Sequence, residues 1–96
     1  MMNKNEILNF LVQNKNDMKK RFSVKRIGLF GSFVRGSQHG KSDVDILVEF
    51  ENPTFDNYMD LKFYLERNIG RPVDLVLVDS LKPRIRNLII KEVAYA

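Results

Sequence analysis

The chain has 96 residues, a net charge of +4 and an ordinary hydrophobic share of 44%, which predict one globular domain over residues 1–96 and exclude a disordered chain. It has no cysteine, which excludes disulfides and thiolate chemistry and suits the reducing cytoplasm, and no apolar run long enough to span a membrane. The mild positive charge is compatible with a triphosphate, an acidic partner surface or RNA.

The first segment, from Asn3 to about Phe22, is predicted to form one amphipathic helix. Asn3 or Asn5 can cap its start, and a basic cluster suits its C-terminal end. Its apolar residues recur on one face with helical spacing, namely Ile7, Leu8, Leu11, Val12, Met18 and Phe22. We expect this helix to build the core and to carry no catalytic group.

A strand over residues 24–30 is predicted next, because the segment is apolar and stops at Gly31. The residues from Ser32 to Arg35 are expected to form a short helical turn, which Gly36 closes in a left-handed conformation. The polar residues 37–41 include a glycine, and this composition predicts a loop.

Two acids stand two residues apart at the start of the next predicted strand, residues 43–50. Alternate residues of a strand share a face, so Asp43 and Asp45 are expected to present two carboxylates side by side. Their repulsion favours a divalent cation such as Mg²⁺, which binds through carboxylates and substrate phosphates. An Asx turn with a surface acid would explain Asp43 but not Asp45. Together with the Gly31–Ser32 turn, the acids predict a site for Mg²⁺ and a nucleoside triphosphate.

The second half of the chain is predicted to alternate helix, strand and helix. The first helix runs from a Thr54 cap to Gly70, and its apolar residues are Phe55, Tyr58, Met59, Leu65 and Ile69. A strand is expected from Pro72 to Val78. The last helix can be capped by Asp79 and Ser80, with Pro83 in its first turn and an apolar stripe of Ile85, Leu88, Ile89 and Val93. The predicted fold class is α/β, a small mixed sheet flanked by helices, with strand order left open.

Asp74 is the single charged residue in the otherwise apolar segment 72–78. Buried acids are rare without a partner, so Asp74 is the third candidate carboxylate of the metal site. The alternative is a strand-end aspartate that pairs with Arg71 or with a backbone amide. We favour the metal site because Asp43 and Asp45 already indicate one, whereas Asp79 lies where a helix cap is needed.

Four further residues near the acids are candidates for phosphate binding. Gly31 and Ser32 are predicted to hold the β- and γ-phosphates through backbone amides and the serine hydroxyl, a geometry that also caps a helix. Arg35 can reach a phosphate or can form a salt bridge that fixes the loop. Ser42 can add a local hydrogen bond or serve as a plain turn residue.

Three short motifs at this spacing resemble the signature of the nucleotidyltransferase superfamily related to DNA polymerase β. They are Gly31-Ser32, Arg35-Gly36 and Ser42-Asp43-Val44-Asp45. The short chain is most similar to the minimal nucleotidyltransferases, the MntA-like antitoxins that pair with HEPN-domain toxins. The resemblance implies the polymerase β palm-like fold, ATP as substrate, and two Mg²⁺ ions bound by the catalytic acids Asp43, Asp45 and Asp74. The third acid of the family serves as general base or metal ligand for the attacking hydroxyl.

The resemblance further implies that AMP is moved from ATP onto a hydroxyl, namely a tyrosine of a HEPN toxin. The chain has no room for a second, acceptor-binding domain, so the acceptor is expected between this domain and another protein. Two other functions stay open, which are neutralisation of the partner by occlusion without catalysis, and transfer to RNA or a small molecule. The missing acceptor domain argues against the latter and favours a protein partner over nucleic acid.

Overall fold

The protein is described here from a computed structural model that covers residues 3–36 and 43–96. In chain order its elements are α1 (Lys4–Gln13), α2 (Lys15–Phe22), β1 (Val24–Phe30), α3 (Ser32–Arg35), β2 (Val44–Phe50), α4 (Phe55–Ile69), β3 (Val73–Leu77), the 3₁₀ turn η1 (Val78–Ser80), α5 (Pro83–Glu92) and β4 (Ala94–Tyr95). The strands form one sheet in the order β3-β2-β1-β4. β1 pairs antiparallel with β2 and β4, whereas β2 and β3 are parallel, so the predicted mixed sheet is confirmed.

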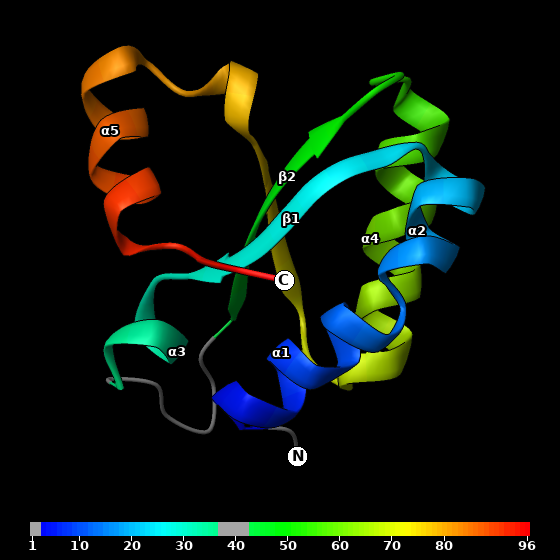
Figure 1. Ribbon diagram of the computed structural model, residues 1–96, viewed down its shortest axis with the longest axis horizontal. Coiled ribbons are helices and arrows are strands. Elements are labelled where there is room, and N and C mark those ends of the chain that lie inside the picture. Colours follow the sequence, from blue (N-terminus) through cyan, green and yellow to red (C-terminus); the bar gives the residue numbers. More distant parts are fainter. Residues whose placement is uncertain (1–2, 37–42) are drawn as a thin grey trace.

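The core lies between this sheet and three helices. Helices α1, α2 and α4 pack on the strands, and α5 stands on the other side of the sheet from α2 and α4 (Figure 1). The β2 side chains Val44, Ile46 and Val48 are fully buried against the helices. Since side chains alternate along a strand, Asp45 and Glu49 project to the opposite face. The apolar pattern of β2 therefore directs its acids away from the core.

The N-terminal segment forms two helices, so the prediction of one continuous helix is wrong. The break falls at Asn14, whose side-chain Nδ2 donates a hydrogen bond to the carbonyl oxygen of Phe10 at 2.8 Å. The Asn14 backbone N–H keeps its own hydrogen bond to this oxygen at 3.1 Å, but the Asn14 backbone leaves the helical region (φ −104°, ψ 10°), and α1 ends there. The break changes the direction of the chain, and Val12, predicted on the buried face, is 55% exposed. The predicted cap at Asn3 is present as a capping box with Glu6.

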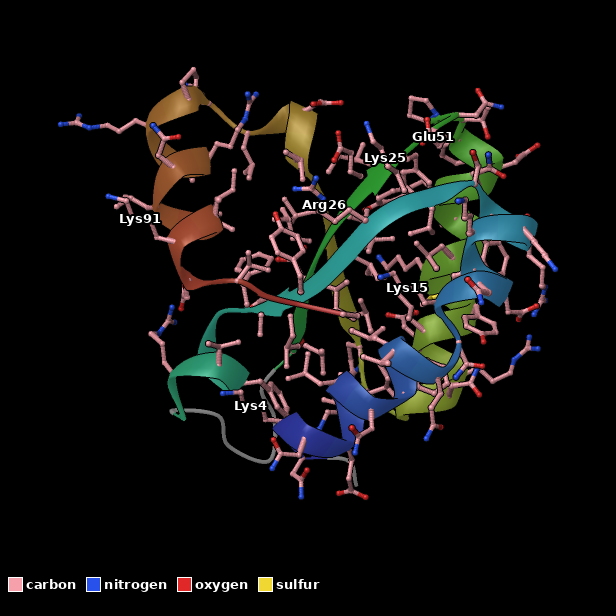
Figure 2. All side chains as sticks on the ribbon, in the orientation of Figure 1. Lys4, Lys15, Lys25, Arg26, Glu51 and Lys91 are labelled. Carbon is pink, nitrogen blue, oxygen red and sulfur yellow. The ribbon has the colours of Figure 1, made fainter. Side chains whose placement is uncertain are left out.

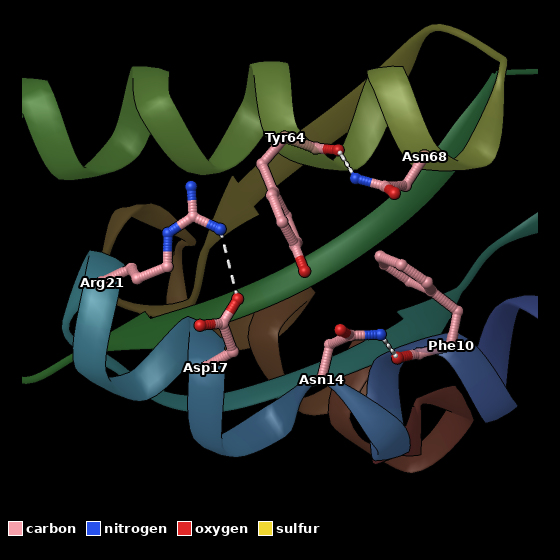
Figure 3. A network of polar contacts seen from close by, with 6 residues as sticks. All are labelled: Phe10, Asn14, Asp17, Arg21, Tyr64 and Asn68. Atoms are coloured by element: carbon pink, nitrogen blue, oxygen red, sulfur yellow. Dashed lines mark hydrogen bonds and ion pairs between the residues drawn. The ribbon is translucent and has the colours of Figure 1, made fainter.

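Side-chain contacts join α2 to α4 around Tyr64 (Figure 3). The Tyr64 ring lies 5.2 Å from the ring of Phe22, and the Arg21 guanidinium stands 5.1 Å from the Tyr64 ring centre. Arg21 also pairs with Asp17 at 3.2 Å. Burial and the Asp17 charge raise the pKa of the Tyr64 phenol, while Arg21 lowers it. These contacts hold α2 against α4 on the face of the molecule that carries no predicted site residue.

Helix α4 begins and ends where the sequence predicts. The Thr54 hydroxyl accepts a hydrogen bond from the Asn57 backbone N–H at 3.1 Å, and Gly70 closes the helix in the left-handed region. One residue of the expected stripe is misplaced, since Phe55 is 77% exposed, and Leu61 is fully buried instead. At 15 residues α4 is the longest described helix, and within the described ranges no helix has the length and apolar content to cross a bilayer.

The C-terminal segment departs furthest from prediction. Asp79 and Ser80 belong to η1 and do not cap α5, whose N-cap is Lys82 without a side-chain hydrogen bond, although Pro83 is in the first turn as expected. The edge strand β4 was not predicted. It lies so close to β1 that a Cβ on Gly28 would stand 2.9 Å from the carbonyl oxygen of Ala94. Only glycine permits this approach, which secures the chain beyond α5 to the sheet.

Candidate active site

Two of the three predicted acids lie beside each other on neighbouring strands. Asp45 on β2 and Asp74 on β3 are partners in the parallel register, so their side chains share a face of the sheet. Asp43 directly precedes β2, two residues before Asp45. Burial raises the pKa of Asp45, and the charges of Asp74 and then Asp43 raise it further. The sheet therefore gathers the three carboxylates into one electrostatic environment.

Asp74 is exposed, which corrects the premise that its strand buries it. The ion pairs found within the described ranges involve Asp17, Glu49 and Glu92, and none of them involves Asp74. The alternative in which Asp74 pairs with Arg71 thus has no support among these pairs. The Asp74 carboxylate is open to solvent on the same face as Asp45, where a substrate could reach both.

Gly31 packs directly on Asp45 at the end of β1. Its backbone (φ +76°, ψ −147°) lies in a region that residues with a side chain rarely adopt. A Cβ added there would overlap Oδ2 of Asp45 and stand 2.9 Å from its Cγ. The residue before it, Phe30, is the β1 register partner of Asp45. The turn that the sequence assigns to phosphate binding is therefore in contact with the central carboxylate.

The short helix α3 follows this turn as predicted. Its N-cap is Gly31, whose carbonyl oxygen accepts hydrogen bonds from the backbone N–H groups of Val34 and Arg35, both at 3.1 Å. Phe33 is 2% exposed and anchors the helix in the core. Ser32 is the first helical residue, and no side-chain hydrogen bond caps this helix. Ser32 is thus a half-buried residue without a capping role, and its predicted contact with phosphate stays a prediction.

Arg35 forms a salt bridge, which is one of the two roles that the sequence predicted for it. The sequence did not identify the partner. Its Nη1 lies 2.6 Å from Oε1 of Glu92, at the end of α5. The Arg35 charge lowers the pKa of Asp45, and that of Glu92 raises it, so both groups lie within electrostatic range of Asp45. Glu92 was missed because no local pattern links two residues so far apart in the chain. The predicted contact of Arg35 with phosphate stays a prediction.

The chemistry of these acids suits a hard divalent cation. Carboxylates are oxygen-only ligands, and a cation would relieve the repulsion that contributes to the raised pKa of Asp45. Over residues 3–36 and 43–96, no three His, Cys, Asp or Glu side chains are arranged as a group that could hold a metal ion. Metal binding by Asp43, Asp45 and Asp74 stays a prediction. Ser42 lies outside the described residues, and its role also stays a prediction.

Both the sequence and the fold match known nucleotidyltransferases. The nucleotidyltransferase domain family matches residues 11–96. The chain is 44% identical over 96 residues to the protein adenylyltransferase MntA of Thermococcus cleftensis, which covers 99% of this chain and 97% of that relative.

Two solved structures share the fold. One, assigned to a minimal nucleotidyltransferase, has a TM-score of 0.76 and 32% identity, covering 97% of this chain and 95% of the other. The second is a crystal structure of a toxin-antitoxin with AMP-PNP, with a TM-score of 0.69 and 26% identity, covering 98% of this chain and 72% of the other. These matches confirm the resemblance read from the motifs, and the chain belongs to the nucleotidyltransferase domain family.

Proposed function

We propose that this chain, as a single domain in the cytoplasm, transfers AMP from ATP to a tyrosine hydroxyl of a HEPN-domain toxin and thereby acts as an antitoxin. The observation that carries the proposal is that Asp45 and Asp74 are register partners on neighbouring strands and that Gly31 packs on Asp45. Two comparisons support it. The Thermococcus relative is named a protein adenylyltransferase, and one structural neighbour is a toxin-antitoxin with AMP-PNP.

In the proposed reaction, the acceptor hydroxyl oxygen attacks the α-phosphorus of ATP. A new oxygen–phosphorus bond forms, the bond from the α-phosphorus to the oxygen bridging the β-phosphate breaks, and pyrophosphate leaves. The proton of the hydroxyl passes to a carboxylate, for which Asp74 is the candidate because it is exposed beside Asp45. The proposed enzyme thus works by positioning and electrostatics, without a covalent intermediate.

Each part of the site has a distinct proposed task. Gly31 and Ser32 would hold the β- and γ-phosphates, and Arg35 would add positive charge at the same end. Asp43 and Asp45 would bind the cations, with the Asp45 carboxylate held in place by its contact with Gly31. When bound, two Mg²⁺ ions would neutralise phosphate charge and would make the acceptor hydroxyl easier to deprotonate.

The direct test is removal of the paired acids. We expect the double variant Asp43→Asn/Asp45→Asn to lose at least about 100-fold in transfer rate, because the carboxylates that would bind the cations are removed. The assay incubates the chain and a HEPN-domain protein from the same genome with labelled ATP and Mg²⁺, and mass spectrometry looks for added AMP on a tyrosine. Asp79→Asn is the matched control, since it removes an exposed acid outside the site.

The same variant separates catalysis from the other functions. If the double variant still neutralises its partner fully, the proposed catalytic antitoxin is wrong and occlusion explains the effect. If label reaches RNA and not protein, and binding weakens steeply with salt, the proposed acceptor is wrong.

A further inference from the structure

Helix α5 carries an apolar stripe that the rest of the described chain covers only in part. We define the α5 stripe as Ile85, Leu88 and Ile89, which share one helix face at i, i+3 and i+4 spacing. Ile85 is 47% exposed, Leu88 is 64% exposed and Ile89 is half-buried. No residue of α5 is fully buried. Exposed apolar residues gathered on one helix face are typical of an interaction surface.

The α5 stripe leads toward the candidate active site. Glu92 follows Leu88 by one helical turn on the same side of α5, and its carboxylate bonds to Arg35 of α3 at 2.6 Å. α3 and the C-terminal end of α5 lie on the same side of the strands (Figure 1). A protein seated on Leu88 would therefore lie about one helical turn from the Arg35–Glu92 pair, which lies within electrostatic range of Asp45.

The charges of α5 indicate the chemistry of its partner. Arg84 and Lys91 are exposed on α5, and Lys82 is exposed at its start. Figure 2 shows Lys91 directed away from the strands. The single acid within α5 is Glu92, which already pairs with Arg35. A complementary surface would be apolar at its centre and acidic at its border.

We infer that the α5 stripe is the docking surface for the acceptor protein, whose matching surface is apolar with an acidic border. Docking there brings the acceptor hydroxyl to the face of the sheet that carries Asp45 and Asp74. The inference rests on the proposed function for the identity of the acceptor, a HEPN-domain protein. It explains how a small nucleotidyltransferase domain can orient a protein substrate.

The test introduces a charge into the stripe. We expect Leu88→Asp to weaken binding of the HEPN-domain protein at least about 10-fold, because a buried apolar contact becomes a desolvated carboxylate. Titration calorimetry measures this Kd, and the KM for the partner should rise while ATP binding is unchanged. Val12→Asp is the matched control, since Val12 is a 55% exposed aliphatic residue on α1, in the other helix layer. Its binding should equal that of the natural chain.

A second variant tests the charged border without altering the stripe. Arg84→Glu should also weaken binding, and more strongly at low than at high salt, since exposed charge pairs are screened. Unchanged binding by both Leu88→Asp and Arg84→Glu would overturn the inference. So would a result in which Leu88→Asp abolishes self-association in sedimentation but leaves partner binding intact, because the stripe would then join two copies of this chain.

The inference and the proposed function fail in different assays. Asp43→Asn/Asp45→Asn should bind the partner normally and lose transfer, whereas Leu88→Asp should lose binding. Normal transfer by the acid variant would refute the proposed function but would leave the docking result standing.

Discussion

Asp45 is the residue on which the candidate site depends most. It touches Gly31, is in register with Asp74, and lies within electrostatic range of Arg35 and Glu92. Burial and neighbouring acids raise its pKa, so the folded state holds the Asp45 proton more tightly than the unfolded state does. The contribution of the protonated Asp45 carboxyl to the stability of the fold is therefore present below its ordinary pKa of 3.8. This contribution is lost as the pH rises through the raised pKa of the folded state.

This linkage predicts that Asp45→Asn stabilises the fold. At pH 7, in metal-free buffer, the variant removes a carboxylate whose ionised form opposes folding, so its urea midpoint should exceed that of the natural chain. The difference should shrink as the pH is lowered, because the natural carboxylate then takes up its proton. A variant that is less stable at pH 7 would show that ionised Asp45 helps to hold the fold, against this reading.

Gly31→Ala should damage both the fold and the site. The positive φ alone is expected to cost about 1–3 kcal/mol of unfolding free energy, and the added Cβ would displace the Asp45 carboxylate. Urea unfolding and the transfer assay measure the two effects. Gly70→Ala is the control, because its φ is +78° but nothing lies within 4 Å of an added Cβ. It should lose stability and keep transfer, and equal activity in both variants would contradict the role given to Gly31.

Among the elements, those with local start and stop signals were predicted best. β1 has its predicted bounds, and α4 has both of its predicted caps. α1 and α2 were joined in the prediction because apolar spacing continues past Asn14, and the change in the Asn14 backbone that separates the helices does not alter this spacing. Caps and turns act within a few residues, so they can be read from a sequence.

The cap of α4 gives an element-level prediction. Thr54→Ala removes the acceptor of the Asn57 N–H bond and should lower the unfolding free energy by about 1 kcal/mol, measured in urea. Thr54→Ser keeps the hydroxyl and should stay within a few tenths of a kcal/mol of the natural chain. Equal losses in the two variants would mean that the threonine methyl group, and not the cap, stabilises this end of α4.

At the scale of the whole molecule, the position of β2 assembles the candidate site. β2 lies between β1 and β3. Gly31, at the end of β1, therefore approaches Asp45 from one side, and Asp74, on β3, lies beside Asp45 on the other side. The edge strand β4 and the Arg35–Glu92 pair then tie the α5 segment to the same sheet. None of these pairings could be read from the chain in advance, because each joins segments that are distant in sequence.

The sequence by itself determined the family, the α/β class and the candidate residues Gly31, Asp43, Asp45 and Asp74, because their types and spacing are local patterns. Only the tertiary structure decided that Asp74 faces Asp45, that Gly28 admits β4, and that Ile85 and Leu88 of the α5 stripe stay exposed. The physical reason is that strand register and burial depend on which distant segments pack together. Periodicity shows which face of an element is apolar, but it does not show what covers that face.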